Sequence, residues 1–169
     1  MYKIPLLGLK VGTHEFDYKL DNQFFDEFEE LEGTIGELNV HVVLIKSESL
    51  MTLNLKLTGA IEALCDRCLD TFNMAFEAET KLLVKFSDES EEQVDDLIVI
   101  SFKEDHLDLK DLFYELYFLN IPLQAIHPDV DGESTCNENM LERLDEYSVD
   151  PVKKIDPRWE ELKKLINNK

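Results

Sequence analysis

Apolar side chains at every second position, in three stretches of the chain, constrain the fold more than any other feature. Two of these stretches, 38–44 and 51–57, are joined by a short polar link at 46–49, and the third spans 72–86. A two-residue period places alternate side chains on opposite faces of a β-strand. The first two stretches therefore predict a β-hairpin, and the third predicts one long strand or two strands with a bend. Because the links are too short for crossover helices, antiparallel pairing is expected.

The remaining segments carry weaker signals of local structure. Apolar residues from Met140 to Tyr147 recur at helical spacing and predict the buried face of a short helix. The pair Asp156-Pro157 predicts a helix start, because an N-cap carboxylate precedes a proline at the first helical position. The further expectations are strands over 13–20 and 97–102, helices over 21–30, 108–121 and 138–147, and a loop over 87–96.

Together these elements predict an α+β fold. We expect an antiparallel β-sheet, as a meander or a partly closed barrel, covered by a helix and followed by a helical C-terminal tail. A chain of 169 residues is long enough for one domain with an appendage. We therefore expect an α+β core domain at residues 1–130 and a helical C-terminal extension at 131–169, with its docking on the core left open.

The charge of the chain is strongly negative. Its 37 acidic and 17 basic residues give a formal net charge of −20. A surface of this sign repels phosphate backbones on average, and it suits either a basic protein partner or solubility alone. Binding of nucleic acid would therefore need a local basic patch.

The cysteine content and the N-terminal segment bear on the compartment. Three cysteines are an odd and sparse set, which argues against a secreted disulfide scaffold. The segment MYKIPLLGLKVG has a short apolar run broken by Pro5 and Gly8, too little for a signal peptide or a membrane span. We expect a cytoplasmic protein with reduced thiols and no membrane partner.

The sequence CDRCL at 65–69 leaves three kinds of chemistry open. Two thiolates separated by two residues can bind one zinc ion from a tight turn, and a structural site needs four ligands. A redox pair is the second alternative, although a thioredoxin-type pair lies at a helix N-terminus after a parallel strand. In the third, two small thiols simply pack near a turn. We keep zinc as a candidate cofactor, and its candidate ligands are Cys65, Cys68, Cys136 and His127.

The sequence contains no pattern typical of an enzyme active site. The four histidines are scattered, and there is no serine elbow, phosphate loop or HExxH sequence. The many carboxylates do not single out an acid–base pair. We expect neither catalysis nor a small-molecule substrate.

Three segments, in the same order along the chain, resemble the YceD family of bacterial large ribosomal RNA subunit accumulation proteins. LTGAIEALCDRCLDTF at 57–72 is similar to the family's strand followed by CxRCL. DLKDLFYELYFLNIPLQAIHP at 108–128 is similar to its acidic-capped helix, which ends in leucine–proline and then a histidine. DPRWEELKKL at 156–165 is similar to its terminal helix. The family often carries a second cysteine pair before this last segment, whereas this chain has Cys136 without a mate.

The resemblance implies a non-catalytic factor that supports accumulation or processing of large-subunit ribosomal RNA. Its partner would be that RNA, bound through local cations, or a basic ribosomal protein, bound through the acidic surface. Trp159 in the tail can stack on a base or anchor an amphipathic helix. The candidate contacts with RNA or another partner are Arg67, Lys153, Lys154, Arg158, Trp159, Lys163 and Lys164.

The residues also leave two functions of other classes open. One is a zinc-stabilised protein-interaction domain unrelated to ribosomes. The other is a thiol oxidoreductase that uses the Cys65–Cys68 pair.

Overall fold

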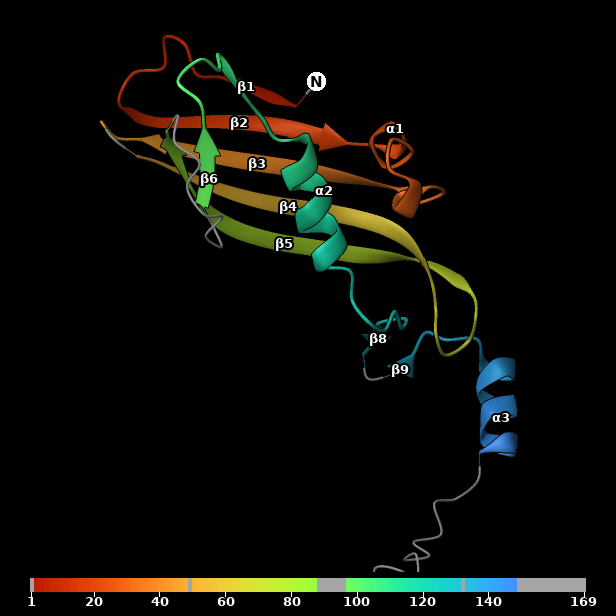
Figure 1. Ribbon diagram of the computed structural model, residues 1–169. Coiled ribbons are helices and arrows are strands. Elements are labelled where there is room, and N and C mark those ends of the chain that lie inside the picture. The colour runs from red at the N-terminus through yellow and green to blue at the C-terminus, as the bar shows by residue number, and fades with distance from the viewer. Residues whose placement is uncertain (1, 49, 88–96, 132, 149–169) are drawn as a thin grey trace, which may run out of the picture.

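The computed structural model describes residues 2–48, 50–87, 97–131 and 133–148, and a curved five-stranded sheet dominates it (Figure 1). In spatial order the strands are β2 (Gly12–Leu20), β3 (Gly36–Lys46), β4 (Met51–Leu64), β5 (Thr71–Phe86) and β6 (Leu97–Ile100). All neighbours pair antiparallel except β5 and β6, which are parallel. The predicted α+β class with a mostly antiparallel sheet is confirmed. The sheet is an open one, so the alternative of a partly closed barrel is wrong.

The register of the sheet follows from the alternation in the sequence. In the β3–β4 hairpin Val40 lies opposite Leu57, and Leu44 lies opposite Leu53. These side chains are buried, while the intervening His41 and Lys56 are exposed on the other face. The third alternating stretch forms β5 as one unbroken strand. A slip of one residue would turn the apolar set toward solvent, which is why the pattern specifies the pairing.

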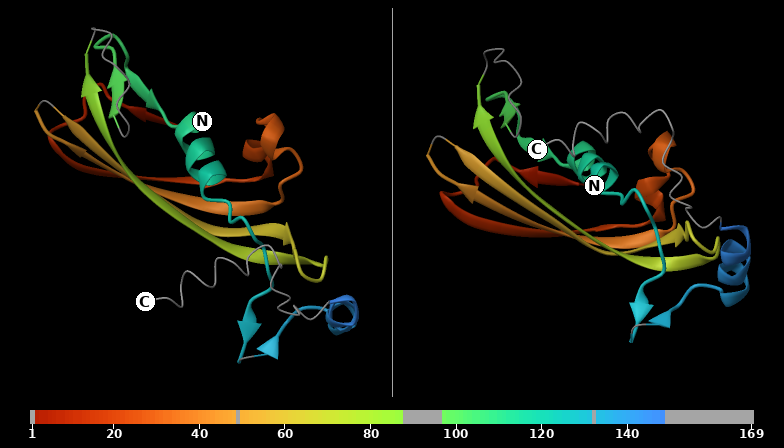
Figure 2. Two further views of the ribbon diagram at one scale, coloured as in Figure 1. Left: turned by 60° about the horizontal axis from the view of Figure 1, so that its bottom comes forward. Right: turned by 90° about the horizontal axis from the view of Figure 1, so that it is seen from below.

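Helices cover the concave face of the sheet (Figure 2). The main one is α2 (Lys110–Leu119), beside the short elements α1 (Asn22–Phe25) and η1 (Glu29–Leu31). The ring of Phe113 is fully buried 5.5 Å from Tyr18 of β2, centroid to centroid. Two further strands, β1 (Lys3–Pro5) and β7 (His106–Asp108), pair with each other outside the main sheet. The predicted helix over the sheet is therefore confirmed.

Two local predictions differ from the structure. The helix predicted over 21–30 begins after an Asp21 cap, as expected, but it is interrupted because Phe28 has an extended backbone. The strand predicted over 97–102 forms as β6 and runs parallel to β5, where antiparallel pairing was expected. Of this strand, Ile100 alone is buried. Residues 88–96 of the predicted loop lie outside the described residues.

The last described elements lie beyond the β4–β5 loop, at one end of the sheet (Figures 1 and 2). They are β8 (Asp129–Val130), β9 (Glu133–Ser134) and α3 (Glu138–Tyr147). The helix predicted at 138–147 is confirmed. Its predicted buried face forms only in part: Met140 and Leu141 are half-buried against the cysteines, whereas Leu144 and Tyr147, the latter 79% exposed, face solvent. The helix predicted from Asp156 onward lies outside the described residues, and among those described no helix is long and apolar enough to cross a membrane.

One glycine permits a close approach of two strands. Gly59 of β4 lies opposite Leu38 of β3, and a Cβ added there would be 2.2 Å from the carbonyl oxygen of Glu37. That separation is far shorter than a carbon–oxygen contact allows. Glycine is therefore required where β3 and β4 come together at this point of the curved sheet.

Candidate metal centre

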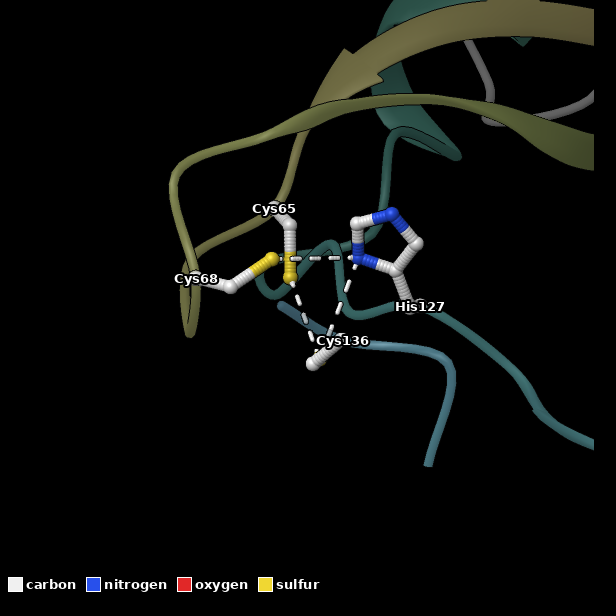
Figure 3. Close-up of side chains that lie close together, drawn as sticks. All are labelled: Cys65, Cys68, His127 and Cys136. Carbon is white, nitrogen blue, oxygen red and sulfur yellow. Dashed lines mark hydrogen bonds between the residues drawn. The ribbon is translucent and has the colours of Figure 1, made fainter. Parts of the chain in front are cut away.

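The loop between β4 and β5 presents two thiols from one tight turn. The amide of Leu69 donates to the carbonyl oxygen of Cys65, and the amide of Cys65 donates to the carbonyl oxygen of Asp70. Leu69 closes the turn with a φ of 62°, in the left-handed region that non-glycine residues seldom adopt. This conformation brings the thiols of Cys65 and Cys68 to one side of the loop (Figure 3).

Two aspartates of the same loop connect it to the segments that follow α2. The carboxylate of Asp66 accepts a hydrogen bond of 2.8 Å from the amide of Ala125, whose carbonyl oxygen accepts one from the amide of Asp66. The carboxylate of Asp70 accepts a bond of 3.0 Å from the side-chain amide of Asn137. These bonds place His127 and Cys136, which lie between Ala125 and Asn137 in the sequence, beside the two thiols.

The four candidate ligands point toward one another (Figure 3). The sulfurs of Cys65 and Cys136 are 3.8 Å apart, and Nδ1 of His127 lies 3.4 Å from Cys68 Sγ and 3.8 Å from Cys136 Sγ. All four ligand atoms lie within 4.8 Å of one another. Zinc–sulfur bonds of about 2.3 Å in tetrahedral geometry require sulfurs about 3.8 Å apart. The donor set and its spacing therefore fit a tetrahedral zinc ion.

The cluster is enclosed by apolar side chains. Cys65, Cys68 and Cys136 are all buried, and Phe72, Met140 and Leu141 pack against them. The His127 ring stacks on Phe72, with the ring centroids 4.4 Å apart and the planes 28° apart. Four protein ligands in a closed pocket are typical of structural zinc sites, whereas catalytic sites keep one position for water or substrate.

The environment of the cluster separates the acidities of two thiols. Burial raises the pKa of Cys65, but the backbone amides of Cys68, His127 and Arg67, together with the His127 side chain, outweigh it and lower the pKa to about 5. At Cys136 a hydrogen bond to Ser134 lowers the pKa of the thiol. Burial and the two neighbouring thiols raise it by more, so the pKa of Cys136 lies above its ordinary value. A thiolate at Cys65 is the form that a metal ion binds.

Some site residues were predicted from the sequence and others were not. Arg67 is exposed at the tip of the loop, and the other six candidate partner contacts, all between residues 153 and 164, lie outside the described residues. The supporting residues Asp66, Asp70 and Phe72 were not predicted. The sequence offered one indication of their role, which is that they lie within a few residues of the cysteine pair. The alternating pattern of residues 72–86 instead predicted Phe72 as an ordinary core residue of the strand.

The comparison with protein families decides the affiliation. The family model for the Large ribosomal RNA subunit accumulation protein YceD matches residues 53–166. This chain belongs to the YceD family. The match runs from β4 through α2 and α3 and contains all four members of the cluster, so the predicted resemblance is confirmed. A search of the curated proteins and a search of the solved structures each find no match. The YceD name implies a role in accumulation of large-subunit ribosomal RNA.

Proposed function

We propose that this YceD protein is a non-catalytic, zinc-stabilised binding factor that supports large-subunit rRNA accumulation by holding a basic ribosomal protein. One observation carries the proposal: a closed cluster of three cysteines and one histidine in a strongly acidic member of the YceD family. Such a cluster leaves no ligand position for a substrate. It suits a scaffold that presents a surface.

Zinc would act here as a cross-link. Cys65 and Cys68 come from the β4–β5 loop, and His127 and Cys136 come from the chain after α2. An ion bound by all four would fix the C-terminal segment against the end of the sheet and add its binding free energy to folding. It would span the boundary we propose at residue 130, because His127 lies in the core (1–130) and Cys136 in the extension (131–169).

The charges favour a basic protein as the partner. Lys3, Lys19, Lys56 and Lys110 each lie within ion-pair distance of a carboxylate. With these cations neutralised, the large excess of acidic side chains dominates the surface that the structure describes. Such a surface attracts basic proteins and repels RNA.

Direct binding of pre-ribosomal RNA is the second candidate. It is favoured by the family's description and by the exposure of Arg67 on the cysteine loop. The cationic tail would supply further contacts: Lys153, Lys154, Arg158, Trp159, Lys163 and Lys164.

A thiol oxidoreductase has less support. Among the described residues, the CDRCL loop follows an antiparallel strand and no helix begins at it. Cys65 and Cys68 are at most 1% exposed, whereas reactive thiols are partly open to solvent. The lowered pKa of Cys65 serves metal binding equally well.

We place the protein in the cytoplasm, where ribosome assembly and reduced thiols coincide.

Depletion of the protein tests the biological role. If the proposal holds, a ribosomal-subunit profile will show large subunits reduced relative to small ones, and re-expression of the wild-type chain will restore them. An unchanged ratio of the subunits would contradict any role in large-subunit accumulation.

Affinity capture tests the mode of binding. A tagged chain is captured from lysate with and without nuclease. Retention of a ribosomal protein after nuclease treatment supports the protein partner, and loss of all ribosomal components supports RNA. A zinc-binding domain unrelated to ribosomes would retain neither.

A further inference from the structure

One edge of the main sheet is open along much of β5. Strand β4 pairs with β5 from Thr71 to Val84, but on the other side β6 pairs with it only from Leu83 to Phe86. From Met74 to Leu82, no strand of the described chain lies on that side (Figure 1). Every second residue of a strand directs its N–H and C=O groups to the same side. This stretch therefore offers backbone groups for another strand.

The opposite edge of the sheet is different. The hydroxyl of Tyr2 donates to the carbonyl oxygen of Lys19 in β2, and the hydroxyl of Tyr18 donates to the carbonyl oxygen of Lys3. The N-terminal segment is thus held beside β2. Of the two edges, the one formed by β5 is the more accessible.

A groove of about 460 Å³ runs between the open part of β5 and α2. Leucines form its apolar part: Leu82 of β5 and Leu112 and Leu119 of α2, the last of which is 79% exposed. The charged residues that line it are Glu79, at the edge of the sheet, and Glu115 of α2. An exposed apolar channel with an acidic rim matches an extended segment that carries both apolar and basic side chains.

The alternation of β5 sets the pattern that such a segment would need. Phe76 and Ala78 face the concave side of the sheet, where α2 lies, and Glu77 and Glu79 face the other side. In an added strand, residues facing α2 would be apolar and the alternate residues would be basic. Lys81 on the same face, and Lys56, which is paired with Glu77, balance these two carboxylates, so the excess negative charge at the groove is that of Glu115 of α2.

We infer that the open edge of β5 and the groove beside α2 bind an extended, basic segment of a protein partner as an additional β-strand. The inference rests on the proposed function, because it takes the partner to be a basic ribosomal protein. A second copy of this chain fits less well. Antiparallel self-pairing of β5 centred on Ala78 would set Glu77 of one copy against Glu79 of the other, and like charges directly opposite destabilise a pair.

The first experiment uses a capped synthetic peptide of alternating valine and lysine with the full-length protein. The peptide is expected to slow amide hydrogen exchange within residues 74–82 by about tenfold or more. The same peptide with every backbone nitrogen methylated keeps its charge but cannot donate a backbone hydrogen bond from either edge, and it should bind about tenfold more weakly. Binding without slower exchange in this stretch, or with equal affinity of both peptides, would overturn the inference.

Charge-reversal variants supply the matched control. The double variant E79K/E115K should weaken peptide binding by about tenfold or more, and E15K/E104K, which reverses two exposed carboxylates away from the groove, should leave it unchanged. Equal loss in both variants would indicate attraction to net charge alone and would contradict a defined groove.

The last arm separates this inference from the proposed function. Basic proteins extracted from nuclease-treated large ribosomal subunits are passed over the wild-type chain and both double variants. Retention by the wild type and E15K/E104K, with loss in E79K/E115K, supports the groove. Equal retention by all three overturns the groove while the proposed function stands. Retention by none overturns the inference, and the subunit profile after depletion then decides separately whether the role in rRNA accumulation holds.

Discussion

The ring of His127 stacks on the ring of Phe72, although 55 residues separate them in the sequence. Phe72 is the second residue of β5, and His127 lies between α2 and β8. The stacking fixes the plane of the imidazole while Nδ1 faces the thiols of Cys68 and Cys136. Phe72, which cannot bind a metal, thus orients His127, which can.

The variant Phe72→Ala should lower zinc affinity by about tenfold, because outer residues that orient ligands typically contribute about this much. Competition with a chromophoric chelator measures the affinity. Phe86→Ala removes an aromatic ring at the other end of the same strand and should leave the affinity unchanged. Wild-type affinity in Phe72→Ala would show that the stacking has no part in holding the ligand.

Purified protein should contain about one zinc ion per chain, because the four ligands complete one tetrahedral site. Elemental analysis should find the metal lost in Cys136→Ser and His127→Ala. The control His41→Ala changes an exposed histidine of β3 and should keep full occupancy. Zinc retained in both cluster variants would contradict the assigned ligand set.

Removal of the metal by a chelator should loosen one region of the protein. Amide exchange should accelerate around Ala125 and through α3, since Cys136 and His127 lose their cross-link to the cysteine loop. Exchange in β3 and the first half of β4 should stay slow, because a separate core of apolar side chains holds them. Uniform acceleration over the whole chain would instead mean that the metal supports the entire fold.

The variant Gly59→Ala should destabilise the protein by at least about 3 kcal/mol, because its Cβ would collide with the backbone oxygen of Glu37. Urea unfolding gives the free energy of unfolding. The neighbouring Thr58→Ala, which changes the opposite face of β4, should cost about 1 kcal/mol or less. A wild-type midpoint for Gly59→Ala would mean that the two strands can separate at this point without loss.

Acid should reveal the hydrogen bond at the start of α2. The amide of Lys110 lowers the pKa of Asp108 below its ordinary value of 3.8, and Lys3 assists it against burial. A depressed pKa in the folded state adds stability above pH 3.8 that disappears as the pH falls through the folded pKa. Asp108→Asn should therefore be less stable than wild type at pH 7, with the difference shrinking toward about pH 2.5.

Urea midpoints at both pH values measure this effect. Asp111→Asn removes a carboxylate from the first turn of the same helix and serves as the control, since no hydrogen bond to Asp111 is found among the described residues. A difference between Asp108→Asn and wild type that stays constant with pH would exclude the carboxylate as its cause.

The local pattern of the sequence determined much of the fold. The two-residue period of residues 38–57 and 72–86 specified the β3–β4 hairpin, the unbroken strand β5 and the buried face of each, because any other register would expose the apolar side chains. The helix predicted over 108–121 formed α2, the cover of the sheet. Each strand or helix must bury its own apolar face, and this requirement is the same whichever element covers that face. The local sequence is therefore enough to predict it.

Only the tertiary structure decided the direction of β6, the exposure of Leu144 and Tyr147 in α3, and the support of the metal ligands. Parallel pairing of β6 with β5 depends on the path of the intervening chain. An alternating pattern of apolar residues predicts a strand but not the direction in which the strand runs. The spacing of CDRCL named Cys65 and Cys68 as candidate ligands, and residue type alone added His127 and Cys136. Their convergence depends on hydrogen bonds between the loop at Asp66 and Asp70 and a segment some 60 residues later, and such long-range bonds leave no periodic trace in the sequence.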